Sequence, residues 1–295
     1  MSSVDPSDTA FPSDTTSSAA RVALASDLHL GVDTSVPSRE REQRFVAWLE
    51  RAADGRFFSS GLPATEIHLV GDLFDFWFEY RRAVPSGHVR LLGTIARIAD
   101  SGIPVHFHVG NHDLWTFGYL EHELGITVHR APIHREYDGL RCLIGHGDGL
   151  GPGDAGYKRL KRLFTARWAR VLFRSLHPDL GIALAAHFSR SSRAATGNHD
   201  AIFRGAEHEW LHAYCTDYLH HHDIDCFLFG HRHLPLDLPV VAGVRSARYI
   251  NLGDWLTHFT SVRIEHGVPS LLSPSRLHRR QAGERGEGRR SKGGP

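Results

Sequence analysis

The sequence contains little cysteine and no long apolar run. Its three cysteines, Cys142, Cys215 and Cys226, form no C-x-x-C pair, and two of them lie in apolar runs of strand length. We therefore expect buried thiols in a reducing compartment. No window is long and apolar enough to span a bilayer. The first twenty residues offer no apolar stretch for a signal-peptide core, so we expect the protein to stay in the cytoplasm.

The chain has no excess of charge of one sign. It carries 34 Lys and Arg against 33 Asp and Glu, so its overall charge indicates no acidic partner. A P-loop is also missing, because the glycine-rich stretch 147–156 is followed by Tyr-Lys and not by Lys-Ser/Thr. Regularly interleaved aromatics and a known nucleic-acid-reading motif are absent as well, and no nucleic-acid partner is expected.

Five short strings of metal-ligand residue types are present, and each follows an apolar run of strand length. The strings are Asp27-Leu28-His29, Gly71-Asp72-Leu73-Phe74-Asp75, Gly110-Asn111-His112-Asp113, Gly145-His146 and Gly230-His231-Arg232-His233. A strand that ends in ligands points them outward from one edge of a sheet, where open α/β proteins place their ligand crevices.

The residue types in these strings suit two divalent cations. Carboxylate, imidazole and amide oxygen form a mixed set that favours Mn, Fe or Zn over Ca or Mg, and we expect manganese. Two cations about 3.5 to 4 Å apart need an anionic bridge, for which Asp72 is available. The remaining ligands would be Asp27, His29 and His233 in one site and Asn111, His146 and His231 in the other.

The order D-x-H, G-D-x-x-D, G-N-H-D, G-H and G-H-x-H resembles the calcineurin-like metallophosphoesterase superfamily over about residues 22–233. The resemblance implies an α/β fold in which two mixed β-sheets pack face to face with helices outside. It also implies that His112 and Asp75 pair as catalytic residues. A second Gly-Asn-His-Asp at 197–200 follows a polar stretch without an apolar strand, and is interpreted as a loop or helix cap.

Further motifs are G-D-L-F-D-F-W at 71–77, H-G-D at 146–148, D-A-G-Y at 154–157 and N-L-G-D-W at 251–255. Together they resemble the UDP-2,3-diacylglucosamine diphosphatases of lipid A synthesis. The best-known branch of that family has Arg and Glu where this chain has His112 and Asp75, so the resemblance is to a sister branch. It implies hydrolysis of the pyrophosphate bond of UDP-2,3-diacylglucosamine to UMP and 2,3-diacylglucosamine 1-phosphate.

The expected reaction leaves two roles open for His112. In either case a hydroxide held between the two cations attacks phosphorus. A phosphate leaving group has a second pKa of about 6 and needs little proton donation. His112 would then bind phosphoryl oxygen, while Asp75 orients it and favours its charged form. For an alcohol leaving group, His112 would be a general acid.

A helical cap is predicted at about residues 152–200. From 157 to 176 apolar residues recur at helical spacing, with seven Lys or Arg and no acid between them. Such a helix could roof the metal site, hold acyl chains on its apolar side and meet an anionic inner-membrane surface on its basic side. It could equally pack on the sheet and leave a solvated arginine face.

Candidate substrate-binding residues lie in or beside this cap. They are Asp154, Tyr157, Arg190 and Arg193. Asp148 and Asp154 also fit a role in orienting His146, or in turns. The expected partner is a lipid-linked nucleotide-sugar; the oligomeric state is not readable. Residues 21–273 should form the metallophosphoesterase domain, flanked by disordered tails at 1–20 and 274–295, the latter basic. His106, His108 and His134 show no partner pattern and receive no role.

Two other functions are compatible with the same strings. A cyclic-nucleotide or phosphoprotein hydrolase could use the same dinuclear core. Phosphoprotein phosphatases, however, place Arg directly after the second Asp of G-D-x-x-D, whereas Phe76 and Trp77 follow Asp75 here and favour an apolar ligand. A non-catalytic scaffold is the alternative from another class. Such proteins commonly lose ligands, and none of the seven positions is missing.

Overall fold

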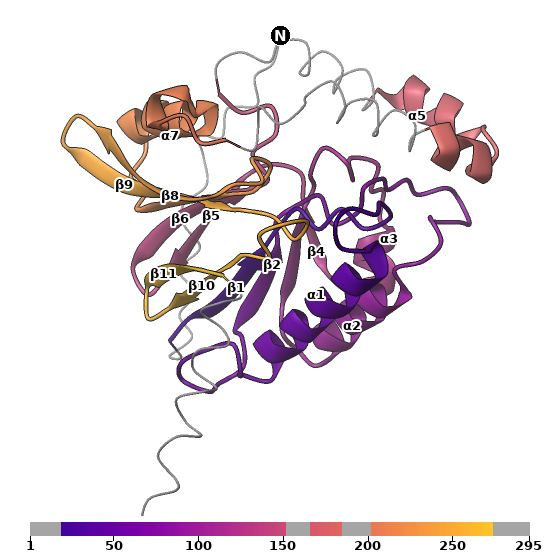
Figure 1. Cartoon of the computed structure of the whole chain (residues 1–295), viewed down its shortest axis with the longest axis horizontal. Coiled ribbons are helices and arrows are strands. Elements are labelled where there is room, and N and C mark those ends of the chain that lie inside the picture. Colours follow the sequence, from indigo (N-terminus) through magenta and orange to yellow (C-terminus); the bar gives the residue numbers. More distant parts are fainter. Residues whose placement is uncertain (1–18, 152–165, 185–201, 274–295) are drawn as a thin grey trace, which may run out of the picture.

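Two β-sheets packed face to face between helices form the protein (Figure 1). The computed structural model describes residues 19–151, 166–184 and 202–273. One sheet has the order β11-β10-β1-β2-β3-β4 and the other β5-β6-β7-β9-β8. The predicted α/β sandwich is therefore confirmed.

The first sheet is built largely from parallel strands, joined by helices on its outer face. Its strands are β1 (Arg21–Ala25), β2 (Glu66–Leu69), β3 (Val105–His108), β4 (Thr127–His129), β10 (Ser261–Glu265) and β11 (Val268–Leu272). The helices between them are α1 (Ser38–Ala53), α2 (Val89–Asp100) and α3 (Tyr119–Leu124). β1 to β4 run parallel, whereas β10 is antiparallel to β1 and to β11.

The second sheet has a parallel centre and antiparallel edges. Its strands are β5 (Ile133–Tyr137), β6 (Leu140–Gly145), β7 (Cys226–Phe229), β8 (Pro235–Ala242) and β9 (Arg245–Leu252). β6, β7 and β9 run parallel, and β5 and β8 pair antiparallel at the edges. The short helix η2 (Ala206–His208) and α7 (Trp210–His221) precede β7. Parallel strands end at the same edge of a sheet, which brings the loops after β1, β2, β3, β6 and β7 together.

Three apolar layers hold these elements together. The first lies between the six-stranded sheet and α1, where Phe45, Trp48, Leu49 and Ala52 are buried. Their spacing of three and four residues places them on one face of the helix. The second layer fills the space between the sheets, and the third lies under α7. The three cysteines are free and buried in the last two layers, as their apolar contexts predict.

The predicted cap is described only in part. Helix α5 (Arg167–Arg174) covers the end of the predicted 157–176 helix, and residues 178–184 are also helical. Asp154, Tyr157, Arg190, Arg193 and the second Gly-Asn-His-Asp lie outside the described residues. Among the helices that the structure describes, each is too short or too polar to cross a membrane.

Candidate metal centre

The loops that carry the predicted ligands turn sharply as soon as their strands end. Five of these residues have a positive φ between 44° and 67°: Asp27, His29, Asp72, His231 and His233. Such left-handed backbone costs a residue other than glycine about 1–2 kcal/mol. Residues in conformations of this kind persist where the surrounding structure fixes them, and they cluster at functional sites.

Backbone hydrogen bonds and two glycines fix the loops against one another. The His29 N–H donates to the Asp72 carbonyl at 2.9 Å, and the Asp27 N–H donates to the Gly71 carbonyl at 3.1 Å. A Cβ on Gly71 would collide with the His146 ring, and one on Gly110 with the Asp72 carboxylate. Only glycine therefore lets these side chains approach the loops so closely.

Arg41 of α1 supports the first loop from behind, a role that the sequence did not reveal. Its guanidinium is fully buried and donates to the carbonyl oxygens of His29 at 2.8 Å and Val32 at 2.6 Å. It also donates to the Val36 carbonyl at 2.6 Å. A planar group with five donors can satisfy several carbonyls of a tight loop at once. The only sequence signal is an arginine on the apolar side of an amphipathic helix.

Asp27, His29 and His233 form the first group of candidate ligands. His233 Nε2 lies 3.1 Å from Asp27 Oδ1 and 3.2 Å from His29 Nε2. His29 Nε2 also lies 3.7 Å from one oxygen of Asp27 and 3.7 Å from one oxygen of Asp72. The ligand atoms of Asp27, His29 and His233 all lie within 4.8 Å of one another, close enough to share one cation.

Asp72, Asn111, His146 and His231 form the second group. His146 Nε2 lies 3.3 Å from Asp72 Oδ2 and 3.2 Å from Asn111 Oδ1. The rings of His146 and His231 are in edge contact, with centroids 5.1 Å apart. Asp72 is thus near His29 of the first group and His146 of the second, the position that a bridging carboxylate requires.

The charges at the site favour bound cations. Burial opposes protonation of His29, but the carboxylates of Asp27, Asp75 and Asp72, each with an oxygen 3.7 Å from the ring, raise its pKa to about 10. Burial also opposes protonation of His146, but the charges of Asp72, Asp27 and Asp148 together raise its pKa well above the usual value. Carboxylates that stabilise a positive charge on buried imidazoles stabilise a divalent cation in the same place.

Two buried atoms provide a further test of whether a metal fits. Among the described residues, Asp27 Oδ1 and His29 Nδ1 make no hydrogen bond, although buried polar atoms normally have a partner. His233 Nε2 lies 3.1 Å from Asp27 Oδ1 without bonding to it. The donor set of carboxylate, imidazole and amide oxygen suits divalent transition metals. These side chains therefore fit divalent metal binding.

The structure places His112 beside Asp75, its predicted partner. His112 Nδ1 donates to the main-chain carbonyl of Asp75 at 2.8 Å, while the nearest carboxylate oxygen is 3.9 Å away. That oxygen lies 3.7 Å from His29 Nδ1. Burial is the largest influence on His112 and lowers its pKa, although Asp72 opposes this. The main-chain carbonyl of Asp75 thus holds the His112 ring, and the charge of the Asp75 carboxylate opposes the lowering of its pKa.

The carbonyl of Val70, which the sequence did not reveal, holds His146 in place. Its Nδ1 donates to the carbonyl of Val70 at 2.9 Å, which leaves Nε2 facing Asp72 and Asn111. The charge of Asp148 raises the pKa of His146. Asp154 lies outside the described residues. A metal-binding histidine commonly donates its second nitrogen to a carbonyl or carboxylate, and Val70 supplies that acceptor here.

The N-L-G-D-W motif at 251–255 supports the loops of the metal centre. The buried Asn251 amide donates to the Gly230 carbonyl, directly before His231. The Trp255 N–H donates to the Asp27 carbonyl at 3.0 Å. Asp254 Oδ2 lies 3.9 Å from His233 Nδ1. The motif therefore has a local physical role, which its distance in sequence from the other strings concealed.

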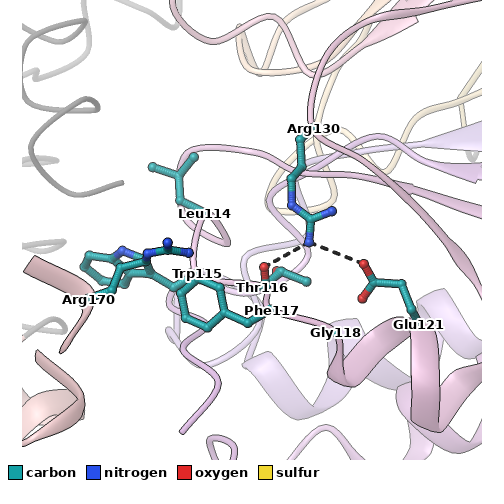
Figure 2. Close-up of a pocket in the computed structure, with 8 residues that line it drawn as sticks. All are labelled: Leu114, Trp115, Thr116, Phe117, Gly118, Glu121, Arg130 and Arg170. Atoms are coloured by element: carbon teal, nitrogen blue, oxygen red, sulfur yellow. Dashed lines mark hydrogen bonds and ion pairs between the residues drawn. The ribbon is translucent and has the colours of Figure 1, made fainter. Parts of the chain in front are cut away.

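A pocket with a volume of about 370 Å³ lies beside the loop that follows His112 (Figure 2). It is lined by Leu114, Trp115, Thr116, Phe117, Gly118, Glu121, Arg130 and Arg170. Arg130 donates to the Thr116 carbonyl at 3.0 Å and to Glu121 at 3.3 Å. The Arg170 guanidinium lies over the Phe117 ring, 5.0 Å from its centroid. Aromatic rings and two arginines thus meet in one hollow.

Helix α5 faces the domain with the side that we expected to face a membrane. The Phe173 ring packs against Phe78 and Trp115, with centroids 4.7 Å and 5.0 Å apart. Arg174, on the same side of the helix as Arg170, donates to the Glu79 carbonyl at 3.2 Å. The large apolar residues on the other side are more than half exposed: Trp168, Val171 and Leu172. Packing of Phe173 sets this rotation, so that Arg170 and Arg174 lie toward the domain.

Comparison with known proteins gives sequence relatives over most of the chain. A UDP-2,3-diacylglucosamine hydrolase of Porphyromonas gingivalis is 34% identical over 264 residues, which cover 85% of this chain and 96% of that protein. A UDP-2,3-diacylglucosamine hydrolase of Escherichia coli is 26% identical over 238 residues, covering 81% and 92%. No protein-family model matches. Among solved structures, the phosphoesterase Yfce from E. coli aligns with a TM-score of 0.43 and 14% identity, covering 88% of this chain and 94% of Yfce. On the identity and coverage of the first relative, the chain belongs to the family of UDP-2,3-diacylglucosamine hydrolases.

Proposed function

We propose that this chain hydrolyses the pyrophosphate bond of UDP-2,3-diacylglucosamine at a dinuclear metal centre. The relatives that share most of its length are named for hydrolysis of this substrate. The observation that carries the proposal is that seven candidate ligand side chains from five loops converge, with Asp72 between the two groups. The products would be UMP and 2,3-diacylglucosamine 1-phosphate.

The ligand side chains would divide between two cations. Asp27, His29 and His233 would hold one, Asn111, His146 and His231 the other, and Asp72 both. Divalent cations at such a site polarise phosphoryl oxygens and lower the pKa of bound water. Manganese is our proposal for both positions, because the set mixes oxygen and imidazole ligands.

His112 would bind a phosphoryl oxygen of the scissile bond. Its Nδ1 is committed to the Asp75 carbonyl, so Nε2 is the nitrogen left for substrate. The ring of His112 meets the His29 ring edge-on at 4.6 Å, which places it next to the first ligand group. Since a phosphate leaving group needs little proton donation, stabilisation of phosphoryl charge is the role that we propose for His112.

The pocket after His112 would receive the acylated part of the substrate. Leu114, Trp115 and Phe117 supply apolar surface, and the arginines at its sides, Arg130 and Arg170, suit anionic oxygens. The exposed apolar side of α5 would contact the surface of an anionic membrane, from which the lipid substrate is drawn. Asp154, Tyr157, Arg190 and Arg193 are proposed to contact the substrate from the rest of the cap.

A comparison of four substrates in the presence of Mn²⁺ tests the proposal. We expect turnover of UDP-2,3-diacylglucosamine to exceed that of UDP-glucosamine without acyl chains, of a cyclic nucleotide and of a phosphopeptide. Preference for either of the last two would indicate another phosphoesterase on the same centre. Less than one metal ion per chain, with no hydrolysis of an activated phosphodiester, would instead indicate a non-catalytic scaffold.

A further inference from the structure

A second group of metal-ligand residue types lies between the two sheets, where apolar side chains would be expected. Its members are Glu66 and His68 of β2, His106 and His108 of β3, His129 of β4 and Tyr137 of β5. The strand register places His68 beside His106 and His108 beside His129. Alternate residues of a strand share one face, so all these side chains of the first sheet point toward the second sheet.

This histidine cluster is separate from the metal centre around Asp72. Glu66 is the first residue of β2, whereas Asp72 follows the end of that strand. The side chains of His68 and His108 are fully buried, and His106 is nearly so. Burying unpaired polar groups is costly, so such a cluster requires a compensating interaction.

The Glu66 carboxylate is the point on which the cluster converges. His68 Nε2 lies 2.8 Å from Glu66 Oε1, and His106 Nε2 lies 3.5 Å from Glu66 Oε2. The two imidazole rings stack with centroids 4.7 Å apart and an angle of 18°, and both Nε2 atoms face the Glu66 carboxylate. The Tyr137 hydroxyl bonds to Glu66 and lies 2.9 Å from His68 Nε2. The ligand atoms of Glu66, His68 and His106 all lie within 4.8 Å of one another.

Each of the two central histidines is backed by another histidine. His68 Nδ1 lies 3.0 Å from His108 Nε2, and His106 Nδ1 lies 3.0 Å from His129 Nε2. Metal-binding histidines typically use one ring nitrogen for the metal and the other for a hydrogen bond that fixes the ring. His68 and His106 both have this arrangement, with Nε2 facing the Glu66 carboxylate.

One buried nitrogen of the cluster has no hydrogen-bond partner. Among the described residues this atom is His108 Nδ1, although buried polar atoms normally have a partner. Hydrogen bonding alone therefore does not satisfy the cluster.

We propose that Glu66, His68 and His106 form a second metal site that binds one zinc ion between the sheets. Two imidazoles and a carboxylate are a common zinc set, with the Tyr137 hydroxyl or a water as fourth ligand. Ligand atoms about 2.0–2.1 Å from a tetrahedral zinc ion are about 3.3 Å apart. The separations of 2.8 Å from His68 to Glu66 Oε1 and 3.5 Å from His106 to Glu66 Oε2 lie on either side of this value. The ion would join β2 and β3, and through Tyr137 the opposite sheet, as a structural site.

Zinc analysis of the full-length protein tests this site. Wild type and Glu66→Gln are saturated with Zn²⁺, freed of excess ion by gel filtration and compared for zinc per chain. We expect Glu66→Gln to hold one zinc ion fewer than wild type. It should keep Mn²⁺-supported hydrolysis of an activated phosphodiester, since Gln retains hydrogen bonding to Tyr137. His106→Gln should lose the same ion. His134→Gln is the matched control, because His134 bonds to the Tyr218 hydroxyl outside the cluster and should change nothing.

A second comparison does not depend on the metal centre. The Asp72→Ala chain, in which that centre is disrupted, should still hold one zinc ion, and Asp72→Ala combined with Glu66→Gln should lose it. Equal zinc in wild type, Glu66→Gln and His106→Gln would overturn the proposal and leave the cluster a hydrogen-bonded network. Failure of Asp72→Ala to retain any zinc would overturn it as well.

Discussion

The Asp113 carboxylate accepts a hydrogen bond from the backbone N–H of Leu73 at 3.0 Å. Its other oxygen accepts one from the Gly110 N–H at 2.6 Å. Asp113 is fully buried, and it ties the loop that carries Asp72 to the loop that carries Asn111. The last residue of Gly-Asn-His-Asp therefore positions ligands without belonging to the proposed ligand set.

Asp113→Ala should weaken metal binding and lower the free energy of unfolding. The change leaves two buried N–H groups without an acceptor, each costing about 1–3 kcal/mol. Urea unfolding and a Mn²⁺ titration measure the two effects. Asp113→Asn is the control, since its amide oxygen can still accept one of the bonds. A folded Asp113→Ala chain with unchanged Mn²⁺ affinity would show that the two hydrogen bonds to Asp113 are not needed to position the ligands.

Asp72→Ala should abolish hydrolysis and reduce bound metal while the fold is retained. Asp72 Oδ2 lies near both His29 and His146, so no other described carboxylate is placed to serve both ligand groups. Metal analysis, circular dichroism and turnover of an activated phosphodiester measure the three effects. Near-normal turnover with two bound cations would remove Asp72 from the centre of the proposal.

His112→Ala should lower turnover by about 10²- to 10³-fold, the usual effect of removing one group that stabilises transition-state charge. Asp75→Asn should lower it much less, because the carbonyl that holds His112 Nδ1 belongs to the main chain and remains. Steady-state kinetics of both variants and of the double variant measure the coupling. If Asp75→Asn lowered turnover as much as His112→Ala, the Asp75 carboxylate would act on the reaction directly.

The sheet and the ligand cluster were predictable because they depend on local patterns. The apolar runs that precede Asp27 and Gly71 form β1 and β2, which end two residues before these positions. Parallel strands then bring their loops to one edge without any further information. The convergence of the seven predicted ligands follows from this one property.

The sequence could not reveal features that depend on packing between distant elements. Which side of α5 faces the domain is decided by Phe173 packing on Trp115, a contact that no periodicity encodes. His106 and His108 looked unrelated to Glu66 because only the strand register brings them together. The bond from His112 to the Asp75 main chain was likewise invisible, since a motif specifies side chains and not carbonyls.

Glu265→Gln should reduce stability at neutral pH, and the loss should fade in acid. Glu265 accepts hydrogen bonds from the N–H groups of Ser59 at 3.0 Å and Ser60 at 2.9 Å. Burial opposes ionisation, but these bonds lower its pKa from 4.5 to about 2. A lowered pKa in the folded state adds stability above pH 4.5, and that stability is lost as pH falls toward 2.

Urea unfolding of wild type and Glu265→Gln between pH 7 and pH 2 measures this difference. The exposed Glu136 offers a matched control, and Glu136→Gln should change stability little at any of these pH values. If the difference in the free energy of unfolding between wild type and Glu265→Gln were the same at every pH, the carboxylate charge would contribute nothing to stability.

We expect the exposed apolar side of α5 to bind the membrane and the side with Arg170 and Arg174 to hold the helix on the domain. Trp168, Val171 and Leu172 are exposed by 62%, 66% and 63%, an unusual exposure for three large apolar residues on one helix. Replacing all three with Gln should weaken binding to phosphatidylglycerol vesicles, since full burial of such a side chain contributes about 1.5–3 kcal/mol. Hydrolysis of a small soluble phosphodiester should survive, because the ligand groups are untouched.

Arg170→Gln with Arg174→Gln is the matched change on the inner side of the same helix. These arginines contact Phe117 and the Glu79 carbonyl, so we expect this variant to alter turnover of the acylated substrate more than vesicle binding. Vesicle co-sedimentation and kinetics on both substrates separate the two effects. Loss of vesicle binding in the double arginine variant, with binding kept when Trp168, Val171 and Leu172 are replaced, would show that the basic side faces the lipid. Helix α5 would then have to rotate on membrane binding and give up the packing of Phe173 on Trp115.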